Sequence, residues 1–363
     1  FKAYALLDVI ECSASLRNEE PGPVRLDGMA SAYLFLHSRE YWLTHFYGAW
    51  SYEMRMTEDL LSNGLKTIDS KRGVRATQGE NPSFLLSLDQ KLNEDYGRVI
   101  LGTLAWSGNF KLDFQVDNLN NLHILAGVND FMSEYTLASG QEIVLPPLIV
   151  TYSASGAGTA SRNMHRWART YALRDGDKIR PVVLNSWEGA FFSFDEELML
   201  HMIRDAASMG AELFVLDDGW FGDKYPRDAA NAGLGDWTVN PKKLPHGLTP
   251  LIRCAAENGI QFGIWVEPEM VSPQSELAEQ HPEWIVRSPN REPMLIRNQL
   301  LLDLTNPEVR EFVYNTVADL LRKNPGIGYV KWDANRHVED FGSSDLKRDE
   351  QSHFWIDYVE ALY

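Results

Sequence analysis

From about residue 180 the sequence alternates short apolar segments with amphipathic ones, and this alternation constrains the fold more than any other feature. Four apolar segments have the length of buried parallel strands: 182–187, 213–216, 262–266 and 329–332. Three amphipathic segments between them predict helices: 195–209, 248–258 and 307–323. This order is the βαβαβαβ pattern of either a (β/α)₈ barrel or a doubly wound sheet.

The residues that follow each predicted strand favour the barrel. Carboxyl or aromatic side chains stand at the end of every one: Trp187-Glu188, Asp217-Asp218, Glu267 and Asp333. No Gly-rich phosphate loop of the dinucleotide-binding type follows the first strand, so no such cofactor is expected. Long loops at 219–247 and 268–300 suit the face where barrel enzymes carry their sites. A complete barrel takes ~250 residues, so only its first half is expected here.

The first 150 residues have a different texture, typical of an antiparallel β-sandwich. Short β-rich segments alternate with Gly, Asn, Asp and Ser, at the spacing expected of such a sandwich. Residues 106–110 are predicted to form a hairpin with Ser-Gly at its turn, and residues 161–173 a linking helix. We therefore predict a β-sandwich at 1–155, a linker helix at 156–178 and an incomplete (β/α)₈ barrel at 179–363.

Composition narrows the possible partners. A formal net charge of −17 disfavours nucleic acid and anionic membrane surfaces, while neutral substrates remain suitable. No apolar run approaches the ~20 residues of a membrane span. The two distant cysteines, Cys12 and Cys254, indicate reduced thiols, and a cytoplasmic location is expected. Because the sequence starts without Met or a signal peptide, we expect it to begin within a longer protein.

Asp333 is the first candidate for chemistry. An Asp at the carboxyl end of a barrel strand can be a nucleophile, a metal ligand or a structural acid paired with a nearby cation. Lys331 lies two residues earlier and projects to the same face of the strand. Its charge is expected to lower the pKa of Asp333 and keep it ionised, as a carboxylate nucleophile requires.

Asp217 and Asp218 form the second candidate group, because adjacent carboxylates repel each other unless both have donors. They suit a metal site, a loop cap or a grip on vicinal sugar hydroxyls. No His stands nearby at ligand spacing, so no metal is expected.

Three other side chains and a short acidic motif complete the candidate set. Trp187 and Trp265 are either core residues or pocket walls. Arg297 is a surface residue, a partner for Asp333 or a ligand for a sugar hydroxyl. The motif Glu267-Pro268-Glu269 is assigned mainly to hydrogen bonds that orient neighbouring groups.

Taken in order, eight motifs resemble those of the family 36 glycoside hydrolases, the bacterial and fungal α-galactosidases. They are LNSWEGAFF (184–192), LFVLDDGWFG (213–222), LGDW (234–237), KLPHGL (243–248), GIQFGIWVEPEMVSPQSEL (259–277), HPEWIV (281–286), RNQLLLDLTNPEV (297–309) and YVKWDANR (329–336). The resemblance covers roughly 181–363, and the β-rich first half suits the family's N-terminal β-sandwich.

The resemblance implies a retaining α-galactosidase acting on raffinose- or melibiose-type oligosaccharides. In that family's pattern Asp333 is the nucleophile that forms a galactosyl ester, and Lys331 binds galactose hydroxyls beside it. Asp217 and Asp218 grip O4 and O6 of galactose. Further pocket residues implied by the resemblance are Trp187, Trp265 and Arg297.

The resemblance also implies what this sequence lacks. The family's acid/base Asp follows a later Gly-rich segment, which has no counterpart before Tyr363. We therefore expect the chain to be a central portion of a longer enzyme, inactive or nearly so alone. The alternatives are an α-N-acetylgalactosaminidase, a galactosyl-transferring relative or a non-catalytic galactoside-binding protein. A homo-oligomer, a tetramer by resemblance, is expected, with Trp50 or Tyr52 facing a neighbour.

Overall fold

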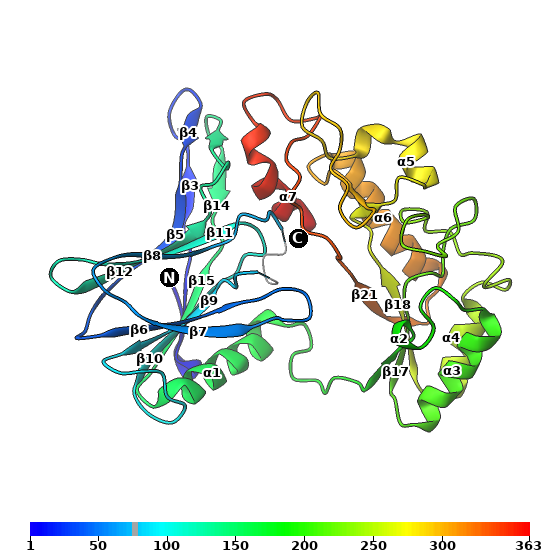
Figure 1. Ribbon diagram of the computed structural model, residues 1–363, viewed down its shortest axis with the longest axis horizontal. Coiled ribbons are helices and arrows are strands. Elements are labelled where there is room, and N and C mark those ends of the chain that lie inside the picture. The colour runs from blue at the N-terminus through cyan, green and yellow to red at the C-terminus, as the bar shows by residue number, and fades with distance from the viewer. Residues whose placement is uncertain (75–78) are drawn as a thin grey trace. The chain divides into compact units, whose positions relative to one another are not determined.

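Two compact units make up the computed structural model, which describes residues 1–74 and 79–363 (Figure 1). The first unit contains Phe1–Lys178, His337–Glu339 and Arg348–Glu360. The second contains Ile179–Arg336, Asp340–Lys347 and Ala361–Tyr363. None of the helices in the described part of the chain is long and apolar enough to cross a bilayer.

The first unit is an antiparallel β-sandwich, which confirms the predicted fold class for this half. One sheet has the order β1 (Lys2–Tyr4), β2 (Val9–Cys12), β15 (Leu148–Ser153), β10 (Arg98–Leu104), β9 (Ser83–Leu88), β6 (Tyr41–Tyr47) and β7 (Arg55–Leu60). The other has the order β5 (Met29–His37), β12 (Asn121–Val128), β11 (Phe110–Val116) and β8 (Gly64–Asp69). Two short pairs flank them: β13 (Tyr135–Leu137) with β4 (Val24–Leu26), and β14 (Glu142–Val144) with β3 (Ser15–Arg17).

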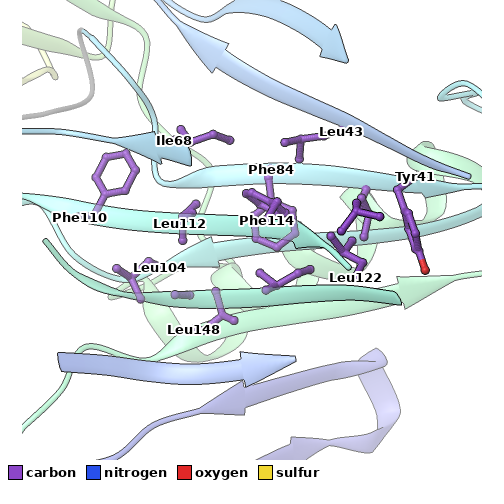
Figure 2. Close-up of a cluster of buried hydrophobic side chains, with 14 of the residues drawn as sticks. Tyr41, Leu43, Ile68, Phe84, Leu104, Phe110, Leu112, Phe114, Leu122 and Leu148 are labelled. Carbon is purple, nitrogen blue, oxygen red and sulfur yellow. The ribbon is translucent and has the colours of Figure 1, made fainter. Parts of the chain in front are cut away.

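The sandwich core forms because alternate side chains of both sheets point inward. Along β11 every second residue is buried, from Phe110 to Val116, as period-two alternation requires. Phe84 of one sheet meets Phe114 of the other edge to face, with ring centroids 5.0 Å apart. Figure 2 shows these rings among the leucine and isoleucine side chains of the same cluster.

The predicted hairpin at 106–110 is wrong. Strand β10 pairs with β9 and β15, whereas β11 pairs with β8 and β12 in the other sheet. The segment between β10 and β11 therefore crosses from one sheet to the other. Both strands have inward-facing apolar residues, and placing them in opposing sheets lets both faces bury the same core.

A helix follows the sandwich; it starts before the helix predicted at 161–173 and ends before the end of the predicted linker at 156–178. Helix α1 runs from Gly156 to Trp167 and continues into a π-helical turn, η3, at Ala168–Ala172. The late helix α7 (Phe354–Leu362) and the 3₁₀ turn η5 (Gln351–His353) lie mostly in the same unit. There Tyr135 donates to Asp357 at 2.8 Å, and His353 accepts the N–H of Thr136 at 2.7 Å.

The second unit contains the parallel sheet that the alternating pattern predicts. Its order is β16 (Val183–Asn185), β17 (Leu213–Leu216), β18 (Gln261–Val266) and β21 (Ile327–Trp332), all parallel. The connecting helices are α2 (Trp187–Ala190), α3 (Glu196–Ser208), α4 (Thr249–Glu257) and α6 (Pro307–Lys323). These four strands and their helices have the architecture of a partial barrel, which confirms the predicted class.

Local sequence signals explain where the helices of this unit begin and end. The Asp195 side chain caps α3 by accepting the N–H of Leu198 at 2.9 Å. Asn306 caps α6 by accepting the N–H of Glu308 at 2.7 Å. Short elements occupy the loop after β18: β19 (Met270–Val271), α5 (Glu276–Gln280), η4 (Pro282–Trp284) and β20 (Leu300–Leu301).

The Phe84–Phe114 contact yields a stability prediction. Phe114→Ala is expected to lower the free energy of unfolding by about 3–5 kcal/mol, because it leaves a cavity between the two sheets. Urea denaturation followed by tryptophan fluorescence measures the change. Phe35→Ala, at an exposed position of β5 in the same sheet as Phe114, should change it by less than about 0.5 kcal/mol. Equal effects of the two substitutions would contradict this description of the core.

Candidate active site

The candidate site lies where three neighbouring parallel strands end. Asp217 directly follows β17, Glu267 directly follows β18 and Asp333 directly follows β21. The strands are in register, because Leu216 pairs with Ile264 and Val266 pairs with Trp332. The structure thus brings the predicted carboxyl groups to one edge of the sheet, the carboxyl edge, where barrel enzymes hold their sites.

Asp217 is almost completely buried and has donors on both oxygens. Its Oδ2 accepts from Nζ of Lys331 at 2.8 Å and from the side-chain amide of Asn185 at 2.6 Å. Its Oδ1 accepts the N–H of Asp218 at 2.8 Å. Its own N–H donates to Oγ of Ser186 at 3.0 Å. The ammonium of Lys331 therefore pairs with Asp217, a partner that the sequence pattern did not suggest.

Asp218 is paired with a second cation, Arg227, which the sequence reasoning missed. Nε of Arg227 lies 3.0 Å from Oδ1, and Nη2 lies 2.8 Å from Oδ2 of Asp218. Nη1 of the same arginine donates to the carbonyls of Ala229 and Ala232. Burial raises the pKa of Asp218, while the guanidinium and the N–H of Gly219 oppose that rise.

Asp333 is held by neutral donors. Its Oδ2 accepts from Nε1 of Trp265 at 2.9 Å and from the amide of Asn335 at 2.7 Å. Its Oδ1 accepts the N–H of Ala334 at 2.9 Å. Burial alone would raise the pKa of Asp333, but these hydrogen bonds and the charge of Lys331 together hold it below its ordinary value. The charge of Lys331 acts in the expected direction, and hydrogen bonds contribute more than it does.

Glu267 supports the loop that carries Asp333. It is fully buried, and its Oε1 accepts the N–H of Asn335 at 2.6 Å. Its Oε2 accepts from Nε2 of Gln299 at 2.8 Å. Burial first, and the negative charge of Asp333 among other causes, raise the pKa of Glu267 from 4.5 to about 7.

Glu269 makes a similar contact on the other side of Pro268. Its Oε1 accepts from the indole N–H of Trp332 at 2.9 Å. The two glutamates thus hold residues on either side of Asp333, which is the orienting arrangement predicted for this motif.

The two predicted tryptophans have different surroundings. Trp265 is 1% exposed, and its backbone carbonyl accepts the indole N–H of Trp220 at 3.0 Å. Trp187 is half-buried at the start of α2 rather than on the strand, and its ring packs edge to face on Phe191 and Phe192. Trp265 therefore reaches Asp333, whereas Trp187 belongs to an aromatic cluster beyond the first strand.

Arg297 is not brought to Asp333. It lies on an exposed loop with a φ of 54°, and it makes no hydrogen bond or ion pair with any other residue that the structure describes. Contact with Asp333, one of its expected roles, is thus absent. Within residues 1–74 and 79–363, no cluster of three His, Cys, Asp or Glu side chains is arranged to hold a metal ion.

The geometry is that of a polar site lined by carboxylates. Two carboxylates have one cation each, one carboxylate has only neutral donors, and tryptophans lie beside them. Fold and site together define a β/α-barrel protein with a carboxylate-based site at the carboxyl edge of its sheet.

Comparison with known families places the chain within one of them. The Melibiase family matches residues 144–363, and the glycosyl hydrolase family 36 N-terminal domain matches residues 1–138. The chain belongs to glycoside hydrolase family 36, which confirms the resemblance seen in its motifs.

Individual relatives support the same assignment. Alpha-galactosidase AgaA of Geobacillus stearothermophilus is 37% identical over 365 residues, covering 100% of this chain and 49% of the relative. Alpha-galactosidase Mel36A of Lactobacillus acidophilus is 34% identical, with coverage of 100% and 49%. The crystal structure of AgaA superimposes with a TM-score of 0.94 at 36% identity, over 98% of this chain and 49% of that one. The chain thus spans about half the length of these relatives.

The raised pKa of Glu267 gives a testable pH dependence of stability. Its stabilising contribution is complete below pH 4.5, and it is lost as the pH rises to about 7, because ionisation is disfavoured in the folded state. The glutamine of the Glu267→Gln variant cannot ionise. Between pH 4.5 and about 7, the free energy of unfolding of this variant should therefore rise relative to that of the wild type, by about 3 kcal/mol at most.

Denaturant unfolding at pH 4.5, 6 and 8 measures this difference. Glu311→Gln, at an exposed position of α6, is the matched control and should show no such increase. If the free energies of unfolding of Glu267→Gln and wild type differed by the same amount at all three pH values, the pKa of Glu267 would not be raised in the folded state.

Proposed function

We propose that this chain carries the nucleophile and much of the sugar-binding site of a retaining glycoside hydrolase, which releases terminal α-linked galactose from raffinose- or melibiose-type oligosaccharides. The observation that carries the proposal is Asp333, kept ionised by Trp265 and Asn335 beside the Asp217–Lys331 pair. Relatives of the chain are named alpha-galactosidases, and a variant of AgaA was solved in complex with raffinose.

In the proposed reaction Asp333 attacks the anomeric carbon. Its Oδ2 is engaged by two donors, whereas Oδ1 accepts one backbone N–H, so Oδ1 has the more available lone pair. A galactosyl ester forms as the glycosidic bond breaks, and a water molecule then hydrolyses the ester. Two inversions at the anomeric carbon leave its configuration unchanged.

Substrate recognition is assigned to the groups around Asp333. Asp217 and Asp218 accept hydrogen bonds from O4 and O6 of galactose, and Lys331 donates to a hydroxyl beside Asp333. A carboxylate has about four acceptor positions. Asp217 already accepts from Lys331, Asn185 and the N–H of Asp218, so about one position remains for a ligand hydroxyl. Trp265, Trp187 and Arg297 are proposed as further pocket residues.

A retaining mechanism also needs a general acid/base about 5–5.5 Å from the nucleophile. We assign this role to no carboxyl group among the site residues of this chain. Asp217 and Asp218 are bound to cations, and Glu267 is fully buried with both oxygens engaged.

The oligomeric state and the cellular location of the protein remain predictions. Trp50 and Tyr52 are exposed, and the guanidinium of Arg55 lies 3.5 Å from the ring centroid of Tyr52. A homo-oligomer in the cytoplasm is the expected state.

Replacement of the nucleophile tests the proposed function. Asp333→Ala in the complete gene product is expected to reduce hydrolysis of a nitrophenyl α-galactoside at least ~10³-fold, because no galactosyl ester can form. Added azide should restore turnover and yield β-galactosyl azide, since azide attacks from the vacated side in a single inversion.

The control is Asp319→Ala on α6, which should retain activity, with circular dichroism showing that both variants fold. Near-normal activity of Asp333→Ala would remove Asp333 from the nucleophile role. Galactoside binding by a wild type that shows no turnover would favour a non-catalytic binding protein.

A further inference from the structure

Arg227 has no role in the proposed reaction, yet it is among the largest fully buried side chains of the described structure. It lies in the loop after β17 and is 2% exposed. Charged side chains are rarely buried to this extent unless they are paired. Its partner is Asp218, one of the two carboxylates proposed to bind galactose hydroxyls.

The contact is a bidentate one. Nε and Nη2 of Arg227 donate to Oδ1 and Oδ2 of Asp218 at 3.0 and 2.8 Å. A planar fork of this kind fixes the carboxylate plane as well as its position, which a point charge cannot do. The arginine is itself fixed by the carbonyls of Ala229 and Ala232, at 3.3 and 3.1 Å from Nη1.

We propose that Arg227 is a positioning residue for sugar recognition: its fork holds the carboxylate of Asp218 in one orientation, so that the remaining acceptor positions of Asp218 face the ligand hydroxyls. The inference rests on the proposed function. Two adjacent buried carboxylates repel each other, so each needs a cation of its own, and Lys331 is already engaged by Asp217. Arg227 supplies the second charge.

The consequence for pH dependence follows from burial. Without the guanidinium, burial raises the pKa of Asp218 with less opposition, so Asp218 takes up a proton at a higher pH than it does in the wild type. A protonated carboxyl has lost acceptor positions, so substrate binding should weaken as the pH falls.

Arg227→Gln in the complete gene product tests the proposal. We expect kcat/KM for a nitrophenyl α-galactoside to fall about 10- to 100-fold at pH 7, the range for hydrogen bonds to charged groups. The acidic limb of the pH profile of kcat/KM should move to higher pH. Arg227→Lys keeps the positive charge but cannot form the bidentate contact. The acidic limb of its kcat/KM profile should therefore lie near that of the wild type, while its affinity for the galactoside should recover only in part.

A double-mutant cycle separates positioning from general loop support. In an Asp218→Asn background the carboxylate is gone, so Arg227→Gln should cost little more. Lys243→Met is the matched control: Lys243 is also buried and donates to the carbonyls of Phe192, Gly219 and Arg227. Its loss loosens the same loops, and its effect should add to that of Asp218→Asn with no shift of the acidic limb.

The possible outcomes are distinct. If the effects of Arg227→Gln and Asp218→Asn were additive and the acidic limb of kcat/KM did not move, Arg227 would have a structural role only. The proposed function would not be affected by that result. A wild-type protein that neither hydrolyses the galactoside nor binds galactose would overturn both. If Arg227→Gln does not fold, Arg227→Lys is used instead and galactose affinity is measured with Asp218 present and with Asp218→Asn. A loss of affinity only when Asp218 is present supports positioning, whereas an equal loss in both backgrounds contradicts it.

Discussion

The two adjacent carboxylates at the end of β17 impose the constraint on which the candidate site depends. Asp217 and Asp218 are 3% and 7% exposed, so both lose hydration and repel each other at close range. Separate cations offset this cost, Lys331 for Asp217 and Arg227 for Asp218. Because one cation comes from β21 and the other from the loop after β17, both segments help to stabilise the end of β17.

This requirement ties together strands that are not neighbours. In the sheet, β18 lies between β17 and β21, so the Lys331–Asp217 pair joins two strands across a third. The end of β18 contributes to the same assembly, since Trp265 donates to Asp333 and Glu267 accepts from Asn335. The ends of the three strands are thus fixed by side chains in addition to the backbone hydrogen bonds of the sheet.

The parts of this arrangement that were predictable from the sequence are those that local pattern specifies. Apolar strand segments, the helix caps at Asp195 and Asn306, and the order of elements all leave periodic or positional signals. The carboxyl groups at the strand ends were predictable because parallel strands of one sheet end at a common edge.

The parts that were not predictable depend on contacts between distant or irregular segments. Arg227 lies in a loop without periodicity, and nothing in one sequence separates it from the chain's other arginines. Lys331 was expected to act on Asp333, but the pairing with Asp217 depends on which strands lie side by side. The segment at 106–110 has the composition of a hairpin turn, yet which sheet receives β11 is decided by burial of its apolar face.

Asp217 and Asp218 are paired with cations, whereas Asp333 is held by neutral donors, and this difference affects how well each carboxylate can act as a nucleophile. A nucleophile that pairs closely with a cation is weaker, because the ion pair must break as the new bond forms. Asp333 is kept ionised mainly by an indole, an amide and a backbone N–H, which stabilise charge without occupying every lone pair.

Its charge also acts on Glu267, whose raised pKa arises in part from Asp333. In the proposed reaction the ester neutralises Asp333, so that contribution disappears and Glu267 ionises more readily in the intermediate than in the free enzyme. A carboxyl oxygen can accept a hydrogen bond whether or not the group is protonated, so the contact from the N–H of Asn335 to Glu267 can support the loop bearing the nucleophile while the charge of Asp333 changes.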